Sequence, residues 1–216
     1  MSAKAATPSA SYILDKLQSL SGIVPIGLFL ADHLFNNSYA LVGVKQYDTV
    51  SAALQTIPWR VPVEFAVLWI PILFHGCYGL YIWWLGKSNS FQHPWMANWI
   101  YTLQRWTGIV AFAFIGWHLY SERYLSHGKS TYASVAQSMQ IPYYVAFYII
   151  GITASSFHLG TGIWNFCCKW GLAVTPRSQR AVGYIGAAIF VVLTIVGIAT
   201  VAGFRYNWRP FEFYTQ

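Results

Sequence analysis

The sequence predicts an all-α integral membrane protein with five transmembrane helices. Of its 216 residues, 56% are hydrophobic and only 9% are charged, whereas a soluble domain usually carries about 25% charged residues. The apolar residues gather in five runs, each near the roughly 20 residues that a bilayer core about 30 Å thick requires. Trp and Tyr collect near the ends of these runs, as they do at membrane surfaces. The even spread of the runs suggests a single domain.

The predicted helices run from about Ser19 to Val42, Val63 to Leu85, Asn98 to Tyr120, Pro142 to Cys168 and Ala181 to Phe204. The two longest loops, 43–62 and 121–141, have room for short surface helices. Residues 1–12 are small and polar with no apolar run beside them, which indicates a disordered tail and not a cleaved signal peptide. Residues 13–216 then form the transmembrane domain.

Several polar features point to no site of their own. The net charge of +7 comes from short clusters of Lys and Arg between the apolar runs, where interfacial cations of a membrane protein belong, so nucleic acid is not an expected partner. Cys77, Cys167 and Cys168 lie in or beside apolar runs and form no CxxC pair, which argues against a disulfide framework or a zinc site. His93 and His127 lie in polar loops and are interpreted as surface histidines.

The first four helices are two copies of one helical pair. Residues 17–24 and 103–110 both read LQxxxGIV, with a hydroxyl residue just before the glycine. The second helix of each pair carries FHxxxG, at 74–79 and 157–162. The two motifs recur in the same order at nearly the same spacing, which indicates a parallel repeat with a pseudo-twofold axis near the membrane normal. The repeat covers about 13–86 and 99–168, and the fifth helix lies outside it at the periphery.

One histidine lies in each of these four helices: His33, His75, His118 and His158. Ionisable residues inside a membrane are costly, face the bundle interior and by default suggest function. A single one can serve as a hydrogen-bond donor between helices, but a repeat that places two of them twice favours a ligand site. At 1.5 Å per residue, His75 and His158 share one level and His33 and His118 lie toward the other surface, which predicts these two pairs.

Haem fits two stacked histidine pairs best. Zinc wants more ligands per site, and di-iron carboxylate sites need Glu and ExxH motifs that are missing here. Haem takes one or two axial imidazoles, and since no CxxCH is present it would be two non-covalent haems b. Gly76, Gly79, Gly160 and Gly162 either leave room for the flat ring or serve close helix packing. Two axial histidines leave no open position, so the expected task is electron transfer.

With these residues in place, the chain resembles the dihaem cytochrome b membrane anchors of succinate:menaquinone oxidoreductases and related fumarate reductases. The matching segments are LQSLSGIVPIGLFLADH (17–33), PILFHGCYGLYI (71–82), NWIYTLQRWTGIVAFAFIGWH (98–118), SFHLGTGIWNF (156–166) and WGLAVTPRSQR (170–180). The resemblance is greatest to the single-chain, five-helix type. It implies that His75 and His158 bind a proximal haem iron and that His33 and His118 bind a distal one.

The resemblance also implies a place in a larger complex. The partners would be a flavoprotein subunit with FAD, an iron–sulfur subunit with its clusters, menaquinone and membrane lipid, and a higher oligomer is left open. The chain would be a subunit of succinate dehydrogenase with no dicarboxylate catalytic site of its own, in a bacterial cytoplasmic membrane with its N-terminus in the cytoplasm. The alternative is the cytochrome b subunit of a hydrogenase or formate dehydrogenase, which would share the haems but not LQRxTG and TPRSQR.

Four polar residues are further candidates for contacts with the haems. Gln18 stands where some family members have His and others Gln, which implies a polar contact at the cytoplasmic end. Arg105 either pairs with a haem propionate through charge-assisted hydrogen bonds or is an interfacial residue. Ser21 and Thr107 either bond a propionate or a preceding helical carbonyl. Some fumarate reductases have Glu where this chain has Ser156, so a proton path through that Glu is not expected.

Two acids are candidates for protonating a quinone near the distal haem. Asp32 adjoins His33 deep in the first helix, where a carboxylate is expensive. Glu64 opens the second helix on the same side, although a carboxylate also favours a helix N-terminus for electrostatic reasons. Arg177 and Arg180 lie at the other surface, where they either pair with propionates or receive the iron–sulfur subunit.

Overall fold

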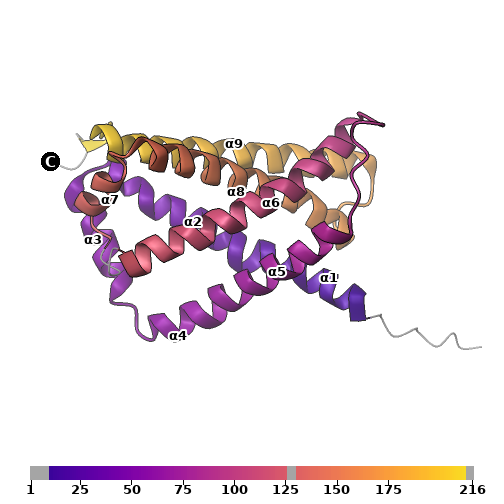
Figure 1. The fold of residues 1–216 in the computed structure, drawn as a ribbon, viewed down its shortest axis with the longest axis horizontal. Helices are drawn as coiled ribbons and strands as arrows, with labels where there is room; N and C mark the ends of the chain where they lie inside the picture. Colours follow the sequence, from indigo (N-terminus) through magenta and orange to yellow (C-terminus); the bar gives the residue numbers. More distant parts are fainter. Residues whose placement is uncertain (1–9, 126–129, 213–216) are drawn as a thin grey trace, which may run out of the picture.

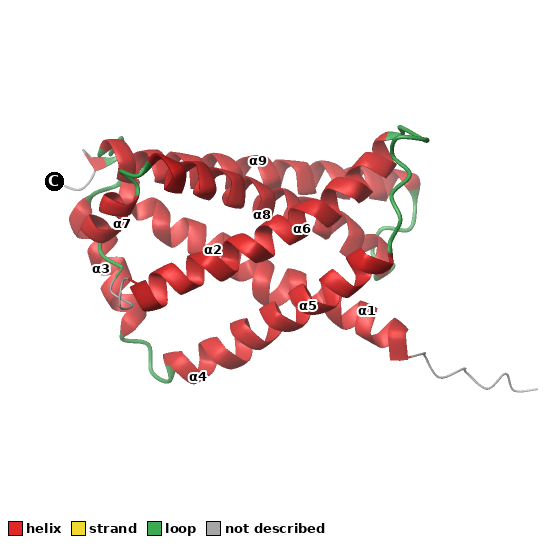
Figure 2. Ribbon diagram, in the orientation of Figure 1, coloured by secondary structure: helices red, strands yellow, loops and turns green. Residues whose placement is uncertain are grey.

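The computed structural model describes residues 10–125 and 130–212, and every regular element in these two ranges is helical (Figures 1 and 2). The α-helices are α1 Ala10–Ser21, α2 Leu28–Asn37, α3 Val44–Gln55, α4 Arg60–Glu64, α5 Ile70–Leu85, α6 Met96–Tyr120, α7 Tyr132–Ser138, α8 Pro142–Lys169 and α9 Pro176–Tyr206. Wider π-helical turns continue the chain at Gly22–Gly27, Phe65–Trp69 and Ser121–Leu125, and a 3-10 turn at Ser38–Leu41.

Four helical stretches of the described chain are long and apolar enough to cross a bilayer: Ser11–Leu41, Arg60–Leu85, Pro142–Lys169 and Pro176–Tyr206. The fifth predicted span, α6, has 25 residues and therefore a length of about 38 Å. Its composition is less apolar because it contains residues such as Asn98, Gln104 and Arg105. It nevertheless lies within the bundle, packed along α8 (Figure 1).

The boundaries correct the sequence prediction at the N-terminal side. The first helix begins at Ala10 and not near Ser19, so the predicted disordered tail, 1–12, is wrong for its last three residues, and 1–9 lie outside the described residues. The two predicted surface helices are present as α3 and α7. The last helix begins at Pro176, earlier than predicted, because Thr175 and Ser178 form a reciprocal capping box.

Two prolines account for two of the π-helical turns. Pro25 lies inside Gly22–Gly27, and Pro71 follows Phe65–Trp69. A proline lacks the backbone N–H and crowds the carbonyl four residues before it, so the regular helical ladder cannot continue through that position. A π-helical turn lets the helix pass, and such turns occur often at functional sites. Both transmembrane helices of the first repeat therefore carry an irregular turn shortly before their histidine.

The bundle has a tightly packed side and a more open one. α8 and α9 lie along each other, and a Cβ added at Gly160 or Gly186 would collide with the other helix's backbone. α6 packs on the next face of α8, whereas α1–α2 and α4–α5 cross on the opposite side (Figure 1). α9 lies at the edge of the bundle as predicted, although its C-terminal half also reaches α2.

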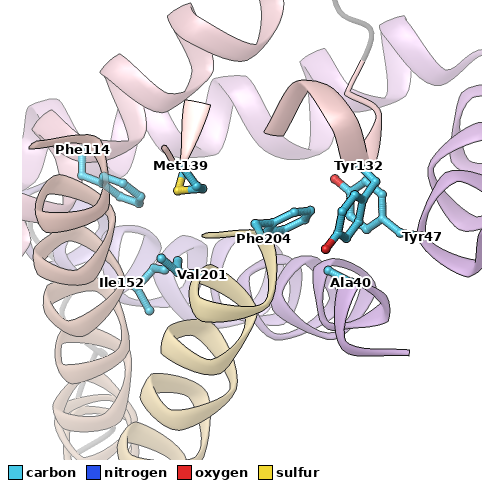
Figure 3. Close-up of a cluster of buried hydrophobic side chains, with 8 residues drawn as sticks. All are labelled: Ala40, Tyr47, Phe114, Tyr132, Met139, Ile152, Val201 and Phe204. Carbon is cyan, nitrogen blue, oxygen red and sulfur yellow. The ribbon is translucent and has the colours of Figure 1, made fainter. Parts of the chain in front are cut away.

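A hydrophobic cluster closes one end of the bundle (Figure 3). Its buried members are Ala40, Tyr47, Phe114, Tyr132, Met139, Ile152, Val201 and Phe204. Tyr132 ties the surface helix α7 to α9, because its hydroxyl lies 3.2 Å from the Gly203 carbonyl oxygen and 3.1 Å from Asn207 Oδ1. The Tyr132 backbone N–H donates to Asp48 Oδ1 of α3 at 2.7 Å. α3 and α7 therefore form a fixed lid over this end.

The close approach of α8 and α9 leads to a stability prediction. Gly186→Ala places a methyl group against the Gly160 backbone, and forced overpacking typically costs about 1–3 kcal/mol. We expect a lower thermal unfolding midpoint in detergent, followed by tryptophan fluorescence. Gly116→Ala is the matched control, since its added Cβ meets no atom within 4 Å and Ala favours a helix by roughly 0.5–1 kcal/mol over Gly. Equal midpoints for the two variants would contradict this packing.

Candidate cofactor-binding site

A large cavity runs through the bundle between the crossing helices. Its volume is about 1950 Å³, and it is lined by residues of all the long helices. Small-molecule sites usually measure about 300–1,000 Å³, so this cavity has room for two sizeable ligands. All four transmembrane histidines, His33, His75, His118 and His158, line it.

The histidines meet in the two predicted pairs. The ring centroids of His75 and His158 lie 6.1 Å apart with an interplanar angle of 86°, and those of His33 and His118 lie 5.7 Å apart at 70°. Imidazole nitrogens bind first-row metals at about 2.0–2.1 Å, so two rings on opposite sides of one ion have centres roughly 6 Å apart. Both centroid distances therefore match one metal ion bound between the two rings of each pair.

The donor set favours a metal that brings its own equatorial ligands. Within residues 10–125 and 130–212, no group of three or more His, Cys, Asp or Glu side chains could enclose a metal ion. Two imidazoles alone are too few for a protein-bound zinc site. They suit haem, whose iron takes axial ligands from the protein.

The pair formed by His75 and His158 follows the internal repeat down to single atoms. His75 Nδ1 lies 2.8 Å from the backbone oxygen of Gln18, and His158 Nδ1 lies 2.9 Å from that of Gln104. A carbonyl can only accept, so Nδ1 carries the hydrogen in both rings and Nε2 keeps its lone pair. Such outer hydrogen bonds commonly orient metal-binding histidines.

Two glycines that the sequence interpretation did not select allow the rings of this pair to approach the neighbouring helix. A Cβ at Gly22 or Gly108 would come closer than 3.0 Å to ring atoms of His75 or His158, respectively. Both glycines belong to the repeated LQxxxGIV motif. The repeat was the sequence signal that could have identified these two glycines. In each copy a glycine follows, one helical turn later, the glutamine whose carbonyl accepts the hydrogen bond from the histidine.

The pair formed by His33 and His118 does not follow the repeat. His118 Nδ1 lies 3.0 Å from the hydroxyl oxygen of Tyr148. The amide nitrogen of Asn37 donates to the His33 carbonyl at 2.8 Å and lies 3.4 Å from the His33 ring nitrogen Nε2, which is a weak contact. Side chains, and not backbone carbonyls, therefore surround the second pair.

Two of the four glycines selected from the sequence leave open space in the cavity, and the other two allow close packing. Gly79 and Gly162 border open cavity, where the nearest neighbours of an added Cβ are the amide nitrogens of Gln18 at 3.8 Å and Gln104 at 3.6 Å. Gly76 instead receives the ring of Phe112, and Gly160 the backbone of α9.

One buried hydroxyl of the cavity wall has no hydrogen-bond partner among the described residues. Ser155 lies one turn before His158, is 6% exposed and lines the cavity, yet its Oγ is unsatisfied. Buried polar groups nearly always find a partner in the protein, in water or in a ligand. This orphan hydroxyl supports a ligand in the space between the two histidine levels.

Three of the predicted haem contacts are engaged with the protein itself. Ser21 Oγ donates to the Gln18 carbonyl at 2.9 Å, and Thr107 Oγ1 to the Leu103 carbonyl at 2.7 Å, which is the helical alternative for both. The Arg105 guanidinium donates to the carbonyls of Ile82, at 2.8 Å, and Trp83. Arg105 thus caps the C-terminus of α5, although it also borders the cavity with Gln18.

The two predicted acids differ in their surroundings. Asp32 is exposed, and its Oδ2 accepts from the Asn36 amide at 3.0 Å. Glu64 is partly buried between two arginines, with Oε1 at 3.5 Å from Arg60 Nε and Oε2 in contact with Arg123. Both acids line the cavity.

Glu122 is a third acid of the cavity that the sequence interpretation missed. It lies just beyond the predicted helix end, but the π-helical turn Ser121–Leu125 continues the helix and turns it inward. Ser130 Oγ donates to its Oε2 at 2.8 Å. The position four residues after His118, one helical turn away, was the available signal.

A family profile described as succinate dehydrogenase/fumarate reductase transmembrane subunit matches residues 87–197. The chain is also 35% identical over 191 residues, 88% of its length, to a protein of Bacillus subtilis (strain 168) described as succinate dehydrogenase cytochrome b558 subunit, of which the match covers 95%. The chain belongs to this transmembrane subunit family. The subunit is accordingly a multi-pass membrane protein, and the profile spans the whole of α6 and α8 with two of the four histidines.

The capping role of Arg105 in this transmembrane subunit is testable. Arg105→Gln removes a charged donor from two carbonyls at the end of α5, and hydrogen bonds to charged groups contribute about 1.5–3 kcal/mol. We expect a lower thermal midpoint for Arg105→Gln in detergent and an unchanged one for Arg177→Gln, whose side chain is exposed. The capping role is wrong if Arg105→Gln unfolds at the same temperature as the unaltered protein.

Proposed function

We propose that this subunit is the membrane anchor and electron-transfer subunit of a succinate dehydrogenase, passing electrons between an iron–sulfur subunit and menaquinone. The observation that carries the proposal is that two histidine pairs, one at each of two levels, line the same cavity. The family match and the name of the Bacillus subtilis relative support it, and they favour it over a hydrogenase or formate dehydrogenase subunit. Fumarate reduction would use the same parts in the opposite direction.

The residues present fit two haems b. His75 and His158 would hold the proximal iron, and His33 and His118 the distal one. Bound there, haem supplies a one-electron carrier at each of two depths in the membrane. The protein's contribution is to orient the rings, through the Gln18 and Gln104 carbonyls for the proximal pair, and to keep the carriers in a largely apolar cavity.

The proposed orientation places the N-terminus in the cytoplasm of a bacterial cell. On that side Arg177 and Arg180 are exposed at the start of α9, where they can meet an iron–sulfur subunit of the catalytic complex. A flavoprotein subunit with FAD would carry the dicarboxylate chemistry. The 13–216 segment would act as one domain, and the complex is free to form a higher oligomer.

Menaquinone is proposed to bind at the opposite end, near His33 and His118. Asp32 and Glu64 are the proposed proton donors, because both border the cavity at that level. Glu64 is held by Arg60 and Arg123. The Asp32 carboxylate accepts a hydrogen bond from the Asn36 side-chain amide.

Replacing one distal ligand tests the haem assignment. In His118→Tyr, we expect the isolated complex to lose about half of its haem, since each haem needs both histidines of its pair. The proximal haem should keep its absorbance band and midpoint potential in a redox titration. His93→Tyr, in the loop before α6, is the control and should retain both haems. Full haem content in His118→Tyr would refute the ligand assignment.

The composition of the native complex tests the proposed role. Purification from its own membranes in mild detergent should yield the subunit together with a flavoprotein and an iron–sulfur protein, identified by mass spectrometry. The eluted complex should oxidise succinate with a quinone analogue as acceptor. Isolation with a hydrogenase or a formate dehydrogenase in place of these partners would overturn the proposal.

A further inference from the structure

The distal histidine His118 has a chain of hydrogen-bonding groups behind it that the proximal histidines lack. Its Nδ1 lies 3.0 Å from the hydroxyl oxygen of Tyr148 on α8. The Glu122 carboxylate, in the π-helical turn after α6, lies close enough to act electrostatically on that hydroxyl, and the Ser121 hydroxyl lies beside it. Glu122 is itself fixed by the Ser130 hydroxyl at 2.8 Å. Imidazole, phenol and carboxylate thus form a sequence of three neighbouring groups.

The direction of these hydrogen bonds follows from the role of the ring. If His118 binds iron through Nε2, its hydrogen must lie on Nδ1, which then donates to Tyr148 Oη. Having accepted one bond, the tyrosine hydroxyl still has its own hydrogen to donate. The carboxylate of Glu122 accepts only, so it is the natural end of the chain.

The tyrosine ring is held firmly enough to fix this geometry. Tyr148 packs edge-on against Phe114 with centroids 5.4 Å apart, and against Phe147 at 6.2 Å. Phe114 also stacks on the His118 ring at 5.7 Å with an interplanar angle of 16°. The same aromatic side chain therefore orients both the ligand and its hydrogen-bond partner.

Through Tyr148, the negative charge of Glu122 acts on the proposed haem ligand His118. In the low-dielectric interior, hydrogen bonds polarise one another along a chain. A carboxylate at its end makes the imidazole more electron-rich, which favours the more positively charged, oxidised state of a bound metal. His75 and His158 donate instead to neutral backbone carbonyls, so this effect is confined to the distal pair.

We propose that Tyr148 and Glu122 are positioning residues that fix His118 as a ligand and lower the midpoint potential of the distal haem. Neither residue touches the iron, and both act through the His118 ring. The proposal rests on the proposed function, because it requires that His118 hold a haem.

The test compares Tyr148→Phe and Glu122→Gln in the purified complex. Tyr144→Phe is the matched control, because Tyr144 stacks beside Tyr148 at 6.3 Å and its variant also loses a phenol hydroxyl from α8. Each haem's midpoint potential is measured by redox titration with absorbance and electron paramagnetic resonance detection. We expect a positive shift of the distal potential in Tyr148→Phe, a smaller shift in the same direction in Glu122→Gln, and unchanged proximal potentials. Tyr144→Phe should shift neither.

Several outcomes would overturn this inference. One is an unchanged distal potential in Tyr148→Phe with both haems bound. Another is a shift in Glu122→Gln without one in Tyr148→Phe, because the charge would then act without the relay. If Tyr148→Phe loses the distal haem, Glu122→Gln decides alone: a raised potential supports the relay and an unchanged one refutes it. Absence of haem from the unaltered complex would instead refute the proposed function.

Discussion

The hydrogen bond from a histidine ring to a backbone carbonyl of the neighbouring helix is the interaction on which the bundle depends. Inside a membrane no water can satisfy a buried N–H group, so the protein must provide the acceptor. Gln18 and Gln104 do so for His75 and His158. These bonds join α1 to α5 and α6 to α8, and they require Gly22 and Gly108 at the points of approach. Helix pairing and the orientation of the histidine rings therefore come from the same contact.

The two halves of the cavity show different degrees of symmetry. The proximal pair keeps the same acceptor and the same glycine in both repeats. In the distal pair the His118 ring meets the Tyr148 hydroxyl, whereas Asn37 donates to the His33 backbone carbonyl and makes only a weak contact with the His33 ring. The distal end also carries Glu64 between two arginines and lies near the lid of α3 and α7. The internal repeat is thus preserved in the contacts of one histidine pair and not in those of the other.

The sequence predicted the helices and the histidine pairs, which follow from periodicity. It did not predict side-chain contacts that depend on the three-dimensional packing of the helices. Apolar length placed the long helices, and the repeat with the helical rise paired the histidines as they are found. The start at Ala10 was missed because Asp15, Lys16 and Gln18 interrupt the apolar residues of the first helical turns. A contact of Arg105 with a haem propionate stays a prediction, and the sequence did not reveal that its guanidinium also donates to the free carbonyls at the end of α5. Glu122 was missed because a π-helical turn carries the helix beyond its apolar run.

The carbonyl acceptors of the proximal pair also bear on how this subunit can change during evolution. Every amino acid supplies a backbone carbonyl, so a mutation at Gln18 or Gln104 leaves the acceptor in place as long as the helix persists. The glycines have no such freedom, because any side chain at Gly22 or Gly108 would strike an imidazole. The proximal site therefore tolerates substitutions at Gln18 and Gln104, whose carbonyls orient the histidine rings. It does not tolerate substitutions at Gly22 and Gly108, although these glycines make no polar contact with the rings.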